Sequence, residues 1–306
     1  MRIGRTQGRY GLTHYLVNDI VLGAAVETYG EWFEAEVDVF RLYCGLGDTV
    51  VDVGANIGTH SMALASIVGP TGRVIAIEPQ RPMFMLLCAN AIMNGYLQID
   101  PYRAVAGPHC LNAQFARIDY DVPDGNFGGY NAALMASMSV NTDTTERLPV
   151  VTLDSLACHA AKLIKVDVEG AELDVISGAR DSIERSQPAL YVENDRIANS
   201  PALIRLIRSL DYRLHWHIPA FFNEDNFAGD HDRLPVHALG LHFSNGQYWV
   251  NGASINMLCL PKGKQLPLPA DVIEVRSEEE HPCLPQCWDR LLGHLGLPGV
   301  RNDTAA

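Results

Sequence analysis

The stretch V-V-D-V-G-A-N-I-G at residues 50–58 constrains the fold more than any other part of the chain. Its β-branched run predicts a strand at 50–53, and two glycines then lead into an apolar-periodic stretch at 59–68 that predicts a helix. A second strand is predicted at 73–79, and a second helix at 82–94 ends at an Asn-Gly pair. Because strands and helices alternate, we expect an α/β fold with a parallel sheet.

The later part of the chain repeats this alternation after an interruption. A third strand is predicted at 102–106, and the polar stretch from Gly107 to about Pro149 predicts a mostly β or loop insertion. Alternation then resumes, and the expected elements are strands at 163–168, 189–194, 212–217 and 254–260 and helices at 169–179 and 201–210. The tail after Pro261 is rich in Pro and Glu, with a short helical stretch near Trp288.

Composition argues against several classes of protein. The formal net charge of −13 at pH 7 disfavours non-specific binding to nucleic acid, which depends on lysine and arginine. The amino terminus lacks the apolar region of a signal peptide, and no run approaches the ~18 apolar residues of a membrane helix. Seven scattered cysteines fit a reducing compartment. We therefore expect a cytoplasmic protein that binds neither nucleic acid nor a membrane.

A group near the carboxyl end could donate to zinc. It consists of His281, Cys283 and Cys287, but no second ligand pair completes a site. We interpret it as a proline-rich tail with two thiols.

The glycines after the first strand raise the question of which nucleotide binds there. A dinucleotide fold needs G-x-G-x-x-G, whereas this loop has Gly54, Asn56 and Gly58 and lacks the second glycine. Asp52 would also bring a carboxylate near a doubly charged pyrophosphate, which is unfavourable at short range. S-adenosylmethionine has an ammonium group and a sulfonium but no phosphate. Asp52 would lie where its methionine end passes, and Glu78 would accept the hydroxyls of its ribose.

Several further stretches resemble the FkbM family of S-adenosylmethionine-dependent methyltransferases. They are Y-G-E-W at 29–32, G-D-T-V-V-D-V-G-A-N-I-G at 47–58, I-E-P at 77–79, V-T-L-D-S-L at 151–156, K-V-D-V-E-G-A-E at 165–172, F-N-E-D-N-F at 222–227 and S-I-N-M-L-C-L-P at 254–261. The resemblance implies a class I, Rossmann-like fold, with a seven-stranded, mostly parallel sheet, one antiparallel strand and helices on both faces. It also implies O-methylation of hydroxyls on sugars and natural products.

This resemblance suggests a division of the chain. We expect an N-terminal segment that covers the site (1–46), an S-adenosylmethionine-binding methyltransferase domain (47–261) with insertions at about 107–149 and 221–251, and a C-terminal extension (262–306). The cofactor-binding residues are expected to be Asp52, Gly54, Asn56, Gly58, Glu78 and Pro79.

Methyl transfer requires that the acceptor oxygen be aligned with the methyl group and lose its proton. We expect Asp167 and Glu169 to face the transferred methyl, with capping of the following helix as the alternative. Lys165 completes the predicted catalytic set, because a lysine in an apolar strand needs an acidic partner. Substrate contacts are expected from Glu31, His215, His217 and Asn226.

Some interpretations stay open. The two histidines of H-W-H are more typical of a strand end than of a catalytic pair, and the segment at 225–251, which contains His237, is interpreted as a mobile polar loop that could close over the acceptor. Asp167, Glu169 and Glu193 could hold a divalent metal, but we predict a metal-free site.

The predicted function is transfer of a methyl group from S-adenosylmethionine to a hydroxyl of a small metabolite such as a sugar, glycolipid or natural product. An N-methyltransferase, an NAD-dependent oxidoreductase and a binding module without catalysis are the alternatives. The chain could also form a homo-oligomer.

Overall fold

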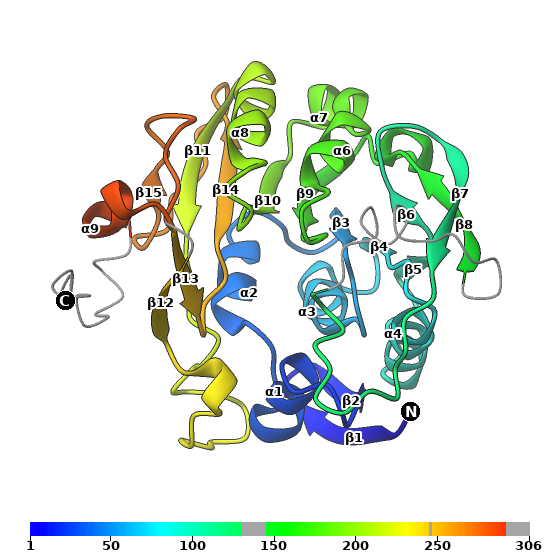
Figure 1. The fold of residues 1–306 in the computed structure, drawn as a ribbon. Coiled ribbons are helices and arrows are strands. Elements are labelled where there is room, and N and C mark those ends of the chain that lie inside the picture. The colour runs from blue at the N-terminus through cyan, green and yellow to red at the C-terminus, as the bar shows by residue number, and fades with distance from the viewer. Residues whose placement is uncertain (130–144, 245–246, 292–306) are drawn as a thin grey trace, which may run out of the picture.

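The computed structural model describes residues 1–129, 145–244 and 247–291. Within these residues the central sheet has eight strands in the order β15-β11-β14-β10-β9-β3-β4-β5 (Figure 1). In chain order they are β3 (Thr49–Val53), β4 (Arg73–Ile77), β5 (Ile99–Tyr102), β9 (Ala161–Val166), β10 (Ala189–Glu193), β11 (Tyr212–His217), β14 (Asn256–Pro261) and β15 (Ile273–Glu274). The strands from β10 to β5 are parallel, and β14 is antiparallel to β10 and β11.

This sheet confirms the expected α/β fold and corrects two details. The C-terminal extension contributes β15, which pairs antiparallel with β11 and brings the described strands to eight instead of seven. The strand predicted at 102–106 is wrong, because β5 begins at Ile99 and the next residues form β6 (Val105–Ala106) in a separate sheet. Pro101 hid β5 in the sequence, yet a proline without an N–H is tolerated there because β5 lies at the sheet edge.

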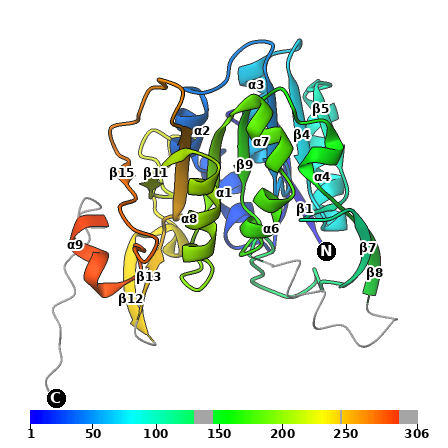
Figure 2. The same cartoon turned by 90° about the horizontal axis from the view of Figure 1, so that it is seen from above.

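Helices cover both faces of the sheet (Figure 2). One core layer contains residues of α2 (Glu34–Phe40), α3 (Thr59–Val68) and α4 (Arg81–Met93), and the other contains residues of α6 (Glu172–Ser177), α7 (Arg180–Ser186) and α8 (Ser200–Ser209). Side chains of β3 alternate between the layers, because Val50 packs with the first set and Val51 and Val53 with the second. The helix predicted at 169–179 begins only at Glu172, because Glu169 and Gly170 have φ angles of +58° and +102°.

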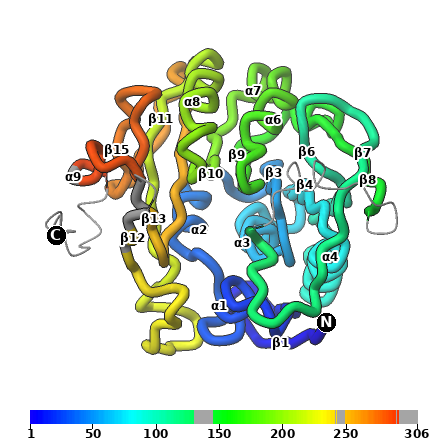
Figure 3. Tube along the Cα trace, viewed as in Figure 1, coloured from blue at the N-terminus to red at the C-terminus, as the bar shows by residue number. Residues whose placement is uncertain are grey.

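Smaller elements surround this core. They are the hairpin β1 (Ile3–Gly8) and β2 (Gly11–Leu16), α1 (Leu22–Tyr29), the sheet of β6 with β7 (Leu111–Ala116) and β8 (Thr145–Val151), the hairpin β12 (Gly240–Ser244) and β13 (Gln247–Asn251), α9 (Trp288–Leu291), and 3₁₀ turns at Leu153–Leu156, Pro235–His237 and Pro285–Cys287. In Figure 3 the chain of α1 lies at the same end of the molecule as the segment that leads into β12.

Two expectations concern these smaller elements. The described part of the insertion at 107–149 contains the strands β7 and β8, as expected, while 130–144 lie outside the described residues. The helical stretch near Trp288 is confirmed as α9, and the rest of the predicted extension, 292–306, also lies outside them. No helix among the described residues has the length and apolarity needed to cross a bilayer.

The loop between β3 and α3 requires its two glycines. Gly54 has a φ of +80°, and a Cβ atom there would lie 1.8 Å from the carbonyl oxygen of Asp167. Gly58 has a φ of +88°, and a Cβ atom would lie 2.6 Å from Leu87 Cδ1. Gly54 thus lets the turn after β3 touch the turn after β9, and Gly58 lets α3 pack against α4.

We expect Gly54→Ala to lower the free energy of unfolding by about 2–4 kcal/mol, because a left-handed backbone and a steric clash add together. Gly95→Ala is the matched control, since Gly95 has a φ of +73° but no atom within 4 Å of the added carbon. It should cost only about 1–2 kcal/mol. Urea unfolding measures both variants. Equal losses would show that the contact with Asp167 adds no penalty.

Candidate functional site

A cavity of about 440 Å³ lies beyond the carboxyl ends of the central parallel strands. This edge of a doubly wound sheet is where ligands generally bind. Most of the polar residues of its wall lie at the ends of four strands or in the turns that follow them. They are Asn56 after β3, with Gly54 beside it, Glu78 and Gln80 after β4, Lys165, Asp167 and Glu169 from β9 and its turn, and Glu193, Asp195 and Arg196 from β10 and its turn.

Lys165 is the buried cation of this wall. Its side chain is 3% exposed, and its Nζ lies 3.2 Å from Asp52 Oδ1 and 3.4 Å from Asp167 Oδ2. The same Nζ donates to the carbonyl oxygen of Gly54 at 3.2 Å, and Ser61 Oγ donates to Asp52 Oδ2 at 2.6 Å. Burial alone would lower the pKa of Lys165, but the two acids outweigh it and raise that pKa. The expectation that Lys165 has acidic partners is confirmed.

Asp52 itself does not line the cavity. Its side chain is completely buried beneath the loop, where Lys165 neutralises it. The expected contact with a cofactor's methionine end is therefore not present, and the expected repulsion of a pyrophosphate by this carboxylate loses its basis. The departure from G-x-G-x-x-G remains, because Asn56 occupies the position of the second glycine. Its φ angle is +51°.

Glu78 lines the cavity at the end of β4. Its Oε2 accepts from the backbone N–H of Asn56 at 2.8 Å and its Oε1 from that of Gln80 at 2.7 Å. Burial raises the pKa of Glu78 to about 7 despite these two donors. Pro79 lies beside it in the cavity wall, whereas Gly58 serves the packing of α3 and does not reach the cavity.

The turn after β9 carries the two predicted catalytic acids. β9 lies next to β3, as expected, so Asp167 and Glu169 enter the cavity wall beside Gly54. Neither acid caps the following helix: α6 begins after Ala171 without a side-chain cap, and Glu172 accepts the N–H bonds of Val168 and Gly170. The capping alternative is therefore wrong.

The turn after β10 adds charges that the predicted catalytic set did not contain. Arg196 Nη2 lies 2.5 Å from Glu169 Oε2, and its Nη1 lies 3.0 Å from Asp195 Oδ2. Burial, followed by the charge of Asp167, raises the pKa of both Glu169 and Glu193. The signal for this turn was present in the sequence, because Asp195 and Arg196 directly follow the strand predicted at 189–194.

His215 and His217 do not reach the cavity wall. Their strand β11 is separated from β9 by β14 and β10. His217 Nδ1 lies 2.7 Å from the Tyr191 hydroxyl and its Nε2 lies 3.3 Å from Asp271 Oδ2. The structure thus contradicts their predicted place at the substrate, and the strand-end interpretation fits.

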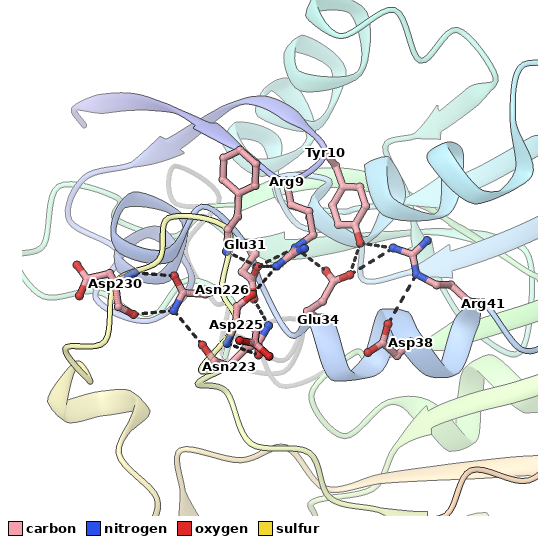
Figure 4. A network of polar contacts seen from close by, with 11 residues as sticks. Arg9, Tyr10, Glu31, Glu34, Asp38, Arg41, Asn223, Asp225, Asn226 and Asp230 are labelled. Atoms are coloured by element: carbon pink, nitrogen blue, oxygen red, sulfur yellow. Dashed lines mark hydrogen bonds and ion pairs between the residues drawn. The ribbon is translucent and has the colours of Figure 1, made fainter.

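Glu31 and Asn226 are also absent from the cavity wall, and Glu31 joins two distant segments instead (Figure 4). Glu31 Oε2 accepts from Arg9 Nε and from the Phe227 N–H, each at 2.8 Å, and its Oε1 accepts from Asn223 Nδ2 at 2.8 Å. Asn226 Nδ2 donates to carbonyl oxygens of its own loop, those of Asn223 at 2.9 Å and Asp230 at 2.6 Å. In this structure Glu31 fastens the loop at 223–230 to the N-terminal segment, and Asn226 stabilises that loop internally.

His237, in the segment interpreted as a mobile polar loop, is a buried residue. It is 1% exposed, and its Nε2 lies 3.0 Å from the carbonyl oxygen of Val21. Its ring packs against Trp32 and Phe221, whose side chains line the cavity and lie 5.4 Å apart between ring centroids. His237 therefore supports these two aromatic residues of the cavity wall from behind.

His60 lines the cavity but was not among the predicted site residues. It lies in the first turn of α3, is 4% exposed and packs edge-on against Phe40. Burial lowers its pKa to about 4, so the ring is neutral at physiological pH.

The tail histidine offers no nitrogen to zinc. His281 Nδ1 accepts from the Cys283 N–H at 3.1 Å, and its Nε2 lies 2.9 Å from the carbonyl oxygen of Asn194. The interpretation as a packed tail fits this geometry.

A parallel sheet with β14 inserted antiparallel between β10 and β11, and with a cavity at its strand ends, is the architecture expected of the class I methyltransferase fold. A model of the methyltransferase FkbM domain matches residues 52–214, more than half of the chain. The chain belongs to this family.

Individual relatives are distant. The hexuronic acid methyltransferase AglP of Haloferax volcanii is 28% identical over 153 residues, which are 49% of this chain and 58% of that protein. This chain thus spans less than two thirds of that relative's length. Among solved structures, a methyltransferase FkbM from Methylobacillus flagellatus is 22% identical with a TM-score of 0.39, covering 58% of this chain and 40% of that one. A SAM-dependent O-methyltransferase from Thermotoga maritima is 11% identical with a TM-score of 0.43, covering 86% and 79%.

We expect Lys165→Met to lower the free energy of unfolding by about 3–5 kcal/mol, because it leaves Asp52 buried without a cation. Adding Asp52→Asn should recover part of this loss, since the buried charge is then removed. Lys262→Met is the control, because Lys262 pairs with Asp211 at the surface, where an ion pair contributes about 0–1 kcal/mol. Urea unfolding of the wild type, Lys165→Met, Asp52→Asn, the double variant and the control tests the pairing. A loss in the double variant equal to the sum of the losses in Lys165→Met and Asp52→Asn would contradict it.

Proposed function

We propose that this methyltransferase uses S-adenosylmethionine and transfers the methyl group to a hydroxyl of a small metabolite such as a sugar, glycolipid or natural product. The supporting observation is that one cavity joins Glu78, at the end of β4, to Asp167 and Glu169, after β9. When bound, S-adenosylmethionine supplies a methyl group on a positively charged sulfur. The residues of the chain must then hold the cofactor at one end and the acceptor at the other.

The turns after β3 and β4 fit the cofactor. Each carboxylate oxygen of Glu78 uses one lone pair for a backbone N–H and retains capacity for a ribose hydroxyl. Asn56 Oδ1 is buried without a hydrogen-bond partner among the described residues, so it can accept from a polar ligand in the cavity. Gly54 leaves bare backbone at the wall, and Pro79 adds an apolar surface beside Glu78.

The other end of the cavity suits a hydroxyl acceptor. The side chain of Asp167 is 38% exposed, so it is accessible to a bound molecule and can receive the proton that the hydroxyl loses. Trp32 and Phe221 present aromatic surface to the cavity, which suits the apolar face of a sugar ring. A sugar acceptor is also in keeping with the name of the Haloferax relative, a hexuronic acid methyltransferase.

The first test is calorimetric titration with S-adenosylhomocysteine and, separately, NADH. We expect S-adenosylhomocysteine alone to bind, and Glu78→Gln to weaken it about 10–100-fold through the loss of charged hydrogen bonds. The pKa of Glu78 is raised to about 7, so the carboxylate forms as the pH rises through that value. Binding by the wild type should therefore tighten between about pH 6 and pH 8, and binding by Glu78→Gln should stay level across this range.

Glu224→Gln controls for the loss of a negative charge, because that side chain is 80% exposed on the protein surface. It should bind S-adenosylhomocysteine like the wild type. Folded protein that binds NADH and not S-adenosylhomocysteine would contradict the proposed cofactor.

The second test is transfer of a labelled methyl group to a panel of sugars and other hydroxylated metabolites. We expect Asp167→Asn to lower the turnover rate about 10²-fold or more, because the acceptor loses its proton acceptor. Its affinity for S-adenosylhomocysteine should change little. Full turnover in Asp167→Asn would exclude Asp167 from this role, and transfer only to amines would favour N-methylation.

A further inference from the structure

We propose that Asp167, Glu169 and Glu193 bind one divalent cation, Mg²⁺ or Mn²⁺, at the acceptor end of the cavity. This replaces the metal-free site expected from the sequence. The action of the cation on an acceptor rests on the proposed function, but its binding rests on these side chains alone.

The three carboxylates converge from adjacent strands. Asp167 and Glu169 follow β9, Glu193 ends β10, and these strands pair in parallel, so their carboxyl ends meet at one edge. One oxygen from each side chain lies within 4.8 Å of the other two. Two ligands of one ion, each at about 2.0–2.6 Å, can be separated by at most about 4–5 Å. The spacing is therefore at the upper end of what a shared ion allows, and a small rotation of one carboxylate would close it.

A second observation, the surroundings of Glu193, supports cation binding. Glu193 Oε2 is buried and has no hydrogen-bond partner among the described residues, although its side chain faces the cavity and the other two acids. A carboxylate oxygen that lacks both water and a donor is energetically costly. A buried orphan of this kind is a sign that an ion or ligand belongs beside it.

The two described cations near these three acids form their ion pairs with residues other than Glu193. Arg196 contacts Glu169 and Asp195, and Lys165 contacts Asp52 and Asp167. In the described part of the chain no ion pair includes Glu193. A divalent ion would satisfy Glu193 and reduce the repulsion among the three acids.

The choice of ion follows from the ligands. Carboxylate oxygens suit hard divalent cations, and no cysteine or histidine belongs to the group. Mg²⁺ and Mn²⁺ also keep free coordination positions for water or substrate. Such an ion could bind two neighbouring oxygens of an acceptor, as in the vicinal diol of a sugar, and lower the pKa of the hydroxyl that is to be methylated. The acceptor proton would then pass to a nearby carboxylate or to water.

The test is titration of the chelator-treated full chain with Mn²⁺ alone. The electron paramagnetic resonance signal of free Mn²⁺ measures how much of the ion is bound. We expect one ion per chain. Glu193→Gln and Asp167→Asn should each weaken binding by about tenfold or more, because loss of a ligand should cost at least as much as loss of a residue that supports one. Glu224→Gln, at the exposed site used above, should bind like the wild type.

Folding of each variant is checked by circular dichroism, and Asp167→Asn decides the question if Glu193→Gln does not fold. No Mn²⁺ uptake at millimolar concentration by folded wild type, or equal uptake by the variants and the wild type, would overturn the metal site. Titration with S-adenosylhomocysteine in chelator is run alongside. If the folded wild type does not bind S-adenosylhomocysteine, the proposed cofactor is refuted, and the result for the metal site is unaffected.

Discussion

The organisation of the cavity depends on the buried contact between Lys165 and Asp52. The two residues are paired in register on β9 and β3, so the sheet itself brings them together. A buried ion pair is stable only when further polar partners complete it, and here the Gly54 carbonyl and the Ser61 hydroxyl do so. Because Lys165 also contacts Asp167, one ammonium group joins the turn after β3 to an acid in the turn after β9.

The acids around the cavity show how surroundings differentiate identical chemical groups. Glu78 has two backbone donors, Glu169 has an arginine, and Glu193 Oε2 has no partner among the described residues. The first arrangement fixes a carboxyl as an acceptor at one end of the cavity. The surroundings of Glu193 leave its carboxylate available to a ligand. A count of acidic residues along the sequence would not have distinguished these roles.

Most of the central fold could be predicted from the sequence, because local periodicity and turn residues indicate the elements β3, α3, β4 and β11. Local signals failed where tertiary context decided the outcome. Pro101 is acceptable in β5 only because that strand ends the sheet, and β15 is two residues long and forms only against β11.

The same division applies to the site. The strand-end rule placed Glu78, Asp167 and Glu169 at the cavity from sequence alone. The predicted substrate contacts of His215 and His217 came from the H-W-H pattern, and the sequence does not reveal that β14 and β10 separate their strand from β9. Asp52 was misassigned for another reason: its partner Lys165 is 113 positions away in sequence, and only the pairing of β3 with β9 reveals that the charge is already neutralised.

The contacts of Glu31 have a consequence for how the protein is made. Arg9 and Glu31 are synthesised first, yet their partners Asn223 and Phe227 emerge from the ribosome only after the strands that build the cavity. Contacts of such long sequence separation form late, because a long loop must close before they are rewarded. The N-terminal segment therefore joins the loop at 223–230 only after the strands β3, β4, β9 and β10 have been made.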